Sequence, residues 1–409
     1  MSDQPKSRLD IATLRRLPRG VWALGLVSLF MDVSSEMIHA LLPLYLVATF
    51  GASTLLVGVI EGAAEATASI TKVFSGALSD MLARRKVLAV VGYGLAAATK
   101  PIFPLAGSIG WLVAARLTDR IGKGIRGAPR DALVADLSPP GLRGASFGLR
   151  QSLDTAGAVV GPLLAIALMW LLANDIRQVF WFAAAPAFVA VALLIFAVHE
   201  PDRPAGLRRV TAPLSLAELK RLGGPLWCVV GAASLFTLAR FSEAFLILKA
   251  SAEGMSAHWV PAVLVLMSLC YTAAAYPAGV ISDNGGRVPV LAAGIGLLIA
   301  ADLILAFVPG LWGVAAGVAL WGVHMGFTQG VFASLVADAA PAELRGTAFG
   351  VLNLMIGLSA LAASVIAGAL WDLSGPKATF MAGAALALAS MMALPMLRAV
   401  LARRKPAPH

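Results

Sequence analysis

The chain has 409 residues, of which 59% are hydrophobic and 13% charged, against roughly 25% charged in soluble globular domains. This composition excludes a soluble domain and indicates an integral membrane protein. The net charge of +10 would suit a nucleic-acid partner, but the placement of the basic residues removes the support for one, because they mark a membrane topology.

Apolar stretches of about 20 residues, the length that crosses a bilayer core, follow one another along the chain. We expect an all-α integral membrane fold with twelve spans, at 20–48, 54–80, 87–108, 110–136, 143–171, 179–199, 225–249, 257–283, 289–308, 311–337, 344–371 and 378–398. The predicted domains are an N-terminal six-helix bundle (1–199), a cytoplasmic linker (200–224), a C-terminal six-helix bundle (225–398) and a cytoplasmic tail (399–409).

Lysines and arginines between the spans fall mostly on one side of this topology, in a ratio of twenty to three. The three on the other side are Arg177, Lys249 and Lys377. Because loops rich in lysine and arginine stay in the cytoplasm, both termini are expected there. The predicted location is the cytoplasmic (inner) membrane, with membrane lipids around a monomer.

Two segments of the chain repeat at one displacement. Leu133–Gly148 reads LVADLSPPGLRGASFG, and Leu335–Gly350, 202 positions later, reads LVADAAPAELRGTAFG. A second motif repeats 203 positions apart, at Gly76-Ala-Leu-Ser-Asp80 with Arg84 and at Gly279-Val-Ile-Ser-Asp283 with Arg287. Two unrelated motifs with nearly the same spacing predict a duplicated unit of half the chain.

Leaving aside those at the span ends, eighteen charged residues lie inside the predicted spans. They are Asp32, Glu36, Glu61, Glu65, Lys72, Lys100, Arg116, Asp119, Arg120, Lys123, Arg126, Arg130, Asp131, Arg150, Asp154, Arg240, Glu243 and Asp302. At roughly 3 kcal/mol each, their exposure to lipid would cost on the order of 50 kcal/mol. They must pair or face water, and fifteen of them lie in the first half. We expect a hydrated interior whose chemistry belongs mainly to that half.

Helical spacing places these charges on defined faces. In the first span Asp32, Glu36 and His39 share a face, and two carboxylates one turn apart titrate as a pair, which suits proton coupling. The fourth span has one charged face and one apolar face. The residues predicted to line a substrate cavity are His39, Asp119, Lys123, Arg126, Arg130, Asp154, Arg240, Glu243 and His324. Fixed ion pairs among the same residues are the alternative interpretation.

The repeated loop motifs, set in twelve spans, resemble the major facilitator superfamily of secondary transporters over nearly the whole chain. The resemblance implies two pseudo-symmetric six-helix bundles with a substrate site between them. It also implies a cytoplasmic latch that closes while the other side is open. The latch residues would be Gly76, Asp80, Arg84, Asp136, Asp283, Arg287 and Asp338.

Within that family the chain is similar in motifs to drug:proton antiporters. The fifth span carries Gly157-x-x-x-Gly161-Pro162, although Ala165-Ile166 replaces the usual glycine pair. The fourth span carries an arginine similar to the antiporters' proton-linked one. Its spacing to Asp136 favours Arg116, and the local sequence favours Arg120. The glycines also suit plain helix packing.

The expected function is therefore proton-coupled efflux of a small organic solute, anionic or zwitterionic, by alternating access. Proton-symport import of an organic anion is the nearest alternative. A transition-metal transporter is another, because His39, His324 and nearby methionines offer nitrogen and sulfur ligands. A sensor or lipid-handling protein on the same scaffold is the remaining one. We expect no enzyme activity, cofactor, resident metal or nucleic-acid partner.

Overall fold

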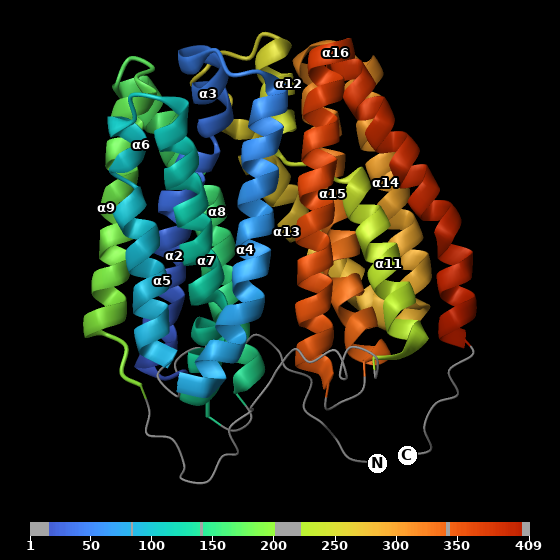
Figure 1. The fold of residues 1–409 in the computed structure, drawn as a ribbon, viewed down its shortest axis with the longest axis horizontal. Coiled ribbons are helices and arrows are strands. Elements are labelled where there is room, and N and C mark those ends of the chain that lie inside the picture. Colours follow the sequence, from blue (N-terminus) through green and yellow to red (C-terminus); the bar gives the residue numbers. More distant parts are fainter. Residues whose placement is uncertain (1–15, 83–84, 140–141, 201–221, 341–343, 403–409) are drawn as a thin grey trace.

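The computed structural model describes residues 16–82, 85–139, 142–200, 222–340 and 344–402. Within these ranges every regular element is a helix. The helices form two groups that stand side by side, one from each half of the chain (Figure 1). The predicted all-α fold with two helical bundles is confirmed.

The N-terminal group contains the first six spans. Its helices are α2 (Arg19–His39), α3 (Leu42–Phe50), α4 (Thr54–Leu82), α5 (Arg85–Thr99), α6 (Ile102–Leu105), α7 (Ile109–Leu137), α8 (Arg143–Leu171) and α9 (Ile176–Phe196). The first span is divided between α2 and α3, and the third between α5 and α6. Pro43 and Pro101 lie at these divisions, where a missing N–H costs the helix no hydrogen bond.

The C-terminal group repeats the arrangement. Its helices are α11 (Gly223–Ala239), α12 (Ala244–Ala252), α13 (Ala262–Gly285), α14 (Arg287–Phe307), α15 (Gly310–Ala339) and α16 (Arg345–Ala402). The last of these is two helices, because Gly375 has a φ of 81° that interrupts the helical backbone.

Nine described segments are long and apolar enough to cross a membrane. The last of them contains the two helices that Gly375 separates. Two further helices, α4 and α7, have 29 residues each but are more polar, because they carry Glu61, Glu65 and the charged face of the fourth span. Together these helices account for the twelve expected spans in the described part of the chain.

Large apolar side chains cover the outside of both groups. Trp312 is 90% exposed, Tyr276 80% and Phe196 78%. In water such a surface would aggregate, whereas lipid accepts it. The outer surface therefore supports a membrane location for both bundles.

The two halves touch most closely along α4 and α16, which lie side by side at the centre of the molecule (Figure 1). Glycines permit this approach: a Cβ on Gly62 would lie 2.9 Å from the Cα of Leu361, and one on Gly357 would lie 2.6 Å from the Cβ of Ser69. On the other side of the molecule, α8 packs against α13. Close glycine contacts of this kind are typical of membrane helix interfaces.

Both interfaces are reinforced at the end of the molecule where α4 begins. The carboxylate of Asp372, from α16, accepts hydrogen bonds from the backbone N–H groups of Thr54 at 3.0 Å and Leu55 at 2.9 Å. Near the end of α8, the Trp170 ring lies edge-on to the His258 ring, with centroids 4.6 Å apart. The halves are therefore joined at this end, and the interior cavities lie between it and the opposite end.

Candidate functional site

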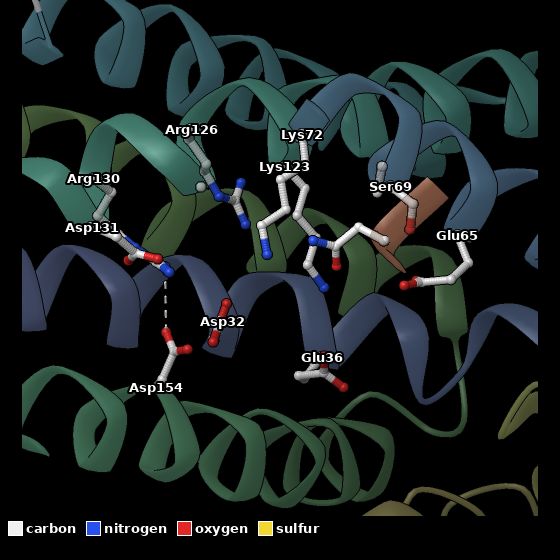
Figure 2. Close-up of a pocket in the computed structure, with 14 residues that line it drawn as sticks. Asp32, Glu36, Glu65, Ser69, Lys72, Lys123, Arg126, Arg130, Asp131 and Asp154 are labelled. Carbon is white, nitrogen blue, oxygen red and sulfur yellow. Dashed lines mark hydrogen bonds and ion pairs between the residues drawn. The ribbon is translucent and has the colours of Figure 1, made fainter. Parts of the chain in front are cut away.

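Two adjoining cavities lie in the interior. The larger, of about 310 Å³, lies between the halves, and the smaller, of about 240 Å³, lies mainly among helices of the N-terminal half. Glu36, Glu65 and Lys123 line both. The smaller cavity is lined by Asp32, Glu36, Glu65, Ala68, Ser69, Lys72, Lys123, Gly124, Arg126, Gly127, Arg130, Asp131, Asp154 and Asn353 (Figure 2). Most of these side chains are charged, so this space is suited to water and polar solutes.

A chain of polar contacts crosses three helices at the larger cavity. Arg116 donates to the Oε2 atom of Glu61 at 2.6 Å, and both side chains are about 5% exposed or less. His39 lies 3.8 Å from the same carboxylate through Nε2 and 3.2 Å from Glu36 through Nδ1. The contacts connect α7, α4 and α2. Glu61 was not among the predicted cavity residues, although it was counted among the buried charges.

A second buried pair links α7 to the turn that follows α5. The ammonium of Lys100 lies 2.8 Å from Asp119 and donates to the hydroxyl of Ser35 at 3.1 Å. Lys100 and Asp119 are 1% and 4% exposed. Arg120 is 3.7 Å from the other oxygen of Asp119. Asp119, predicted to line the cavity, is thus engaged in a buried pair, while Arg120 lines the larger cavity.

A third cluster lies further along α7. Arg130 contacts Asp131 at 3.0 Å, Ser28 at 3.3 Å and Asp154 at 3.7 Å. Arg150 donates to Asp154 at 3.2 Å. Figure 2 shows Asp32 beside Asp154, with Arg126 and Lys123 reaching toward it from α7.

Several predicted cavity residues have no ion-pair partner. Arg126 lies over the ring of Tyr93, 4.7 Å from its centroid, an arrangement that attracts a cation electrostatically. Within the described residues, Lys123 forms neither a hydrogen bond nor an ion pair, and the same holds for Glu65, which is not among the predicted cavity residues. Both side chains are exposed to the cavities. They are a carboxylate and an ammonium available to a solute.

The paired glycines of α8 pack directly on the acidic turns of α2. A Cβ on Gly157 would lie 2.8 Å from the carbonyl oxygen of Leu29 and 2.9 Å from the Cβ of Asp32. A Cβ on Gly161 would lie 2.9 Å from the Cβ of Glu36. The motif therefore forms a helix-packing seam, and that seam fixes the part of α2 that carries both acids.

The C-terminal wall of the larger cavity includes an interruption that the sequence did not predict. The seventh span is broken between α11 and α12, and Arg240, Phe241, Ser242 and Glu243 of the break line the cavity. The backbone N–H of Ser242 donates to Ser364 of α16 at 3.3 Å. The rest of this wall is mainly apolar and comprises Leu264, Met267, Ser268, Tyr271, Met325, Ala360 and Ser364.

His324, predicted as a cavity residue, is fully buried. Its ring centroid is 5.5 Å from that of Trp321 and 6.0 Å from that of Phe236. The next residue, Met325, lines the cavity in its place. His39 and His324 are therefore not brought together as ligands of one site.

The predicted latch is described only in part. Arg84 lies outside the described residues; Gly76 and Asp80 belong to α4, Asp283 to α13, Arg287 to α14 and Asp338 to α15. Asp136 forms an ion pair with Arg85, the neighbour of Arg84. Arg85 also donates to the carbonyl of Ala132 at 3.2 Å, and its backbone N–H donates to Glu200 at 2.7 Å. These contacts join the ends of α5 and α7 and the segment after α9.

Comparison with known proteins shows the family to which this chain belongs. The Major Facilitator Superfamily profile matches residues 24–265 and 244–409. An uncharacterised MFS-type transporter of Methanocaldococcus jannaschii is 32% identical over 388 residues, covering 93% of this chain and 95% of the relative. The inner membrane transport protein YajR of Escherichia coli is 26% identical, covering 90% and 81%.

The same fold occurs in solved structures. The nucleoside transporter NupG superposes with a TM-score of 0.76 at 13% identity, covering 92% of this chain and 99% of that one. At that identity the likeness is one of fold. From the sequence profile and the helical architecture, the chain is a multi-pass membrane protein and a member of the major facilitator superfamily of secondary transporters.

Proposed function

We propose that this protein exports a small charged organic solute across the cytoplasmic membrane in exchange for protons. The observation that supports it best is the pair of carboxylates, Asp32 and Glu36, one turn apart on a helix that lines the cavities. Intramembrane acids at a cavity are typical of proton pathways. The solute and the coupling ion would meet in one space.

The contacts of these acids suit the transfer of a proton. Asp32 lies beside Asp154, with Arg126 and Lys123 reaching toward it (Figure 2). Glu36 contacts His39, which in turn contacts Glu61, the partner of Arg116. Movement of Arg116 or of a solute would change the charge balance at each carboxylate, which is the requirement for coupling.

Alternating access would use the two interfaces between the halves. In the present conformation the Thr54–Asp372 contact and the Trp170–His258 contact join the halves at one end. Asp131, further along α7 toward the opposite end, is 41% exposed. Rocking of one bundle against the other would separate the halves at the end joined by Thr54 and Asp372. It would bring them together at the opposite end, where the latch of Asp80, Arg84 and Asp136 is predicted.

Charge and architecture support cytoplasmic termini and a monomer. The excess of lysine and arginine on one side supports cytoplasmic termini, and YajR is named an inner membrane protein. Both cavity walls come from one chain, which supports a functional monomer.

The test is flux in proteoliposomes with an imposed pH gradient. Three radiolabelled probes would be compared: benzoate as an anion, leucine as a zwitterion and ethidium as a cationic drug. We expect gradient-driven movement of at least one charged probe, opposite in direction to protons, and its loss in Asp32→Asn and Glu36→Gln. Asp175→Asn, remote from the cavities, is the matched control.

The same vesicles separate the alternatives. Movement of the probe in the same direction as protons would indicate a symporter, and the export proposal would be abandoned. Retention of gradient-driven flux in both carboxylate variants would show that coupling lies elsewhere. Absence of flux for all charged probes, with a folded protein, would favour a sensor or lipid-handling role.

A further inference from the structure

The two walls of the larger cavity differ in chemistry. The N-terminal wall consists of Glu36, His39, Glu61, Glu65, Arg116, Arg120, Lys123 and Ala158. The C-terminal wall carries Arg240 and Glu243 at the break between α11 and α12, and the rest of it is mainly apolar, with Phe241, Leu264, Met267, Tyr271 and Met325. A solute that fills this space touches a charged surface on the N-terminal side and, away from Arg240 and Glu243, an apolar surface on the C-terminal side. Such a space selects a molecule with a charged head and an apolar body.

The charges available to that head have both signs. Glu61 is engaged by Arg116, and Glu36 by His39. Glu65 on α4 and Lys123 on α7 are exposed to both cavities and have no ion-pair or hydrogen-bond partner among the described residues. A carboxylate and an ammonium that remain unpaired on one wall complement a head that carries an ammonium and a carboxylate.

The dimensions exclude a large solute. A volume of about 310 Å³ lies at the low end of the range for small-molecule sites, roughly 300–1,000 Å³. The smaller cavity is lined mainly by charged side chains, so an apolar molecule could not extend into it without desolvating them, a cost that no hydrogen bond would offset. A bulky lipophilic drug therefore does not suit this space.

We propose that the cavity binds a small amino-acid-like zwitterion with an apolar side group, its ammonium at Glu65, its carboxylate at Lys123 and its side group against Met267, Tyr271 and Met325. This inference rests on the proposed function, because it names the solute class of the same cavity. A simple anion would contact Lys123 but not Glu65, and a simple cation would contact Glu65 but not Lys123. A hydrophilic zwitterion would leave the apolar wall in contact with water.

Binding can be measured without any gradient, by titration calorimetry on the full chain in nanodiscs. Four probes form a matched set: leucine, leucinamide without the carboxylate, N-acetylleucine without the ammonium, and glycine without the apolar group. Loss of one charged hydrogen bond costs about 1.5–3 kcal/mol, so leucinamide and N-acetylleucine are expected to bind at least about tenfold more weakly. Burial of the leucine side chain, about 2 kcal/mol, gives about thirtyfold over glycine.

Variants assign each end of the zwitterion. Lys123→Gln is expected to remove the preference for leucine over leucinamide and keep the preference over N-acetylleucine. Glu65→Gln is expected to do the reverse. Lys377→Gln is the matched control, because Lys377 lies over the Phe307 ring, remote from the cavities. A general loss of folding would weaken the binding of all four probes together. It would not remove one preference while keeping the other.

The outcomes are distinct from those that test proton coupling. Equal binding of the four probes, tightest binding of N-acetylleucine, or no binding of leucine overturns the zwitterion site. If leucine fails to bind while benzoate is moved by a pH gradient, this inference fails and the proposed function stands. If leucine binds with the expected preferences but no gradient moves it, the site stands and the proton-coupled function fails.

Discussion

The carboxylate of Asp372 caps the first turn of α4 at Thr54, across the boundary between the two halves. It accepts from the backbone N–H groups of Thr54 and Leu55 and from the Thr54 hydroxyl. A carboxylate at a helix N-terminus satisfies N–H groups that lack a partner within the helix and interacts favourably with the helix dipole. Here the cap belongs to the other bundle, so a helix-capping contact also holds the two halves together.

Asp372→Ala should favour separation of the halves at this end. Removal of a cap costs about 1 kcal/mol, which corresponds to about a fivefold shift from the joined toward the separated arrangement. Spin labels at Leu105 and Leu311, exposed residues of the two halves, would report the change by electron–electron distance measurement. The expected result is a larger population of long distances.

Asp175→Ala is the control for that experiment. Asp175 caps α9 within one half by accepting from the Gln178 backbone N–H at 3.2 Å. Hydrogen bonds from Gln178 lower the pKa of Asp175, so this cap is present at neutral pH and is lost only as the pH falls toward the lowered pKa. If both variants changed the distances equally, Asp372 would act on helix stability alone.

Gly157→Ala should disturb the seam that positions Asp32. The added Cβ would lie 2.8 Å from a backbone carbonyl oxygen of α2, and backbone cannot move aside as a flexible side chain can. We expect a loss of about 1–3 kcal/mol in the free energy of unfolding and reduced transport. Gly148→Ala on the same helix meets nothing within 4 Å and should be neutral or slightly stabilising. Thermal unfolding of both variants would decide, and equal stability would contradict the packing argument.

The Lys100–Asp119 pair should behave as a buried unit. Loss of one partner leaves an uncompensated charge, at a cost of about 3–5 kcal/mol, so Lys100→Met and Asp119→Leu should each lower the thermal stability strongly. The double variant Lys100→Met/Asp119→Leu removes both charges and should recover most of it. Additive losses in this double-mutant cycle would show that the two residues act independently.

The sequence predicted the helices and the charged faces because both depend on local periodicity. Asp32, Glu36, Lys123 and Arg126 line a common space. The repeat predicted the two bundles, since each copy of the motif marks the same position in its half. These inferences needed no knowledge of which helices are neighbours.

Partners from different helices could not be predicted in the same way. Glu61 and Arg116 are 55 positions apart, and Thr54 and Asp372 are 318 apart, so their pairing depends on how the bundle packs. The break at Arg240–Glu243 carries no proline or glycine, the residues that normally signal one. His324 was predicted to line the substrate cavity, but it is buried beside the aromatic rings of Trp321 and Phe236.

The choice between Arg116 and Arg120 as the coupling arginine can be tested through Glu61. Arg116→Gln leaves the carboxylate of Glu61, 5% exposed, without its guanidinium partner, and should cost about 3–5 kcal/mol of stability. Arg120→Gln removes only a 3.7 Å contact to Asp119, which keeps Lys100 as its partner, and should cost less.

The double variant Glu61→Gln/Arg116→Gln has no unpaired charge and should regain stability, so its transport reports on coupling rather than folding. We expect pH-gradient-driven flux in proteoliposomes to remain absent in this double variant and to persist in Arg120→Gln. The reverse pattern, with flux retained in the double variant and lost in Arg120→Gln, would assign coupling to Arg120, because only a residue that carries the proton-linked charge removes the gradient dependence from a stable protein.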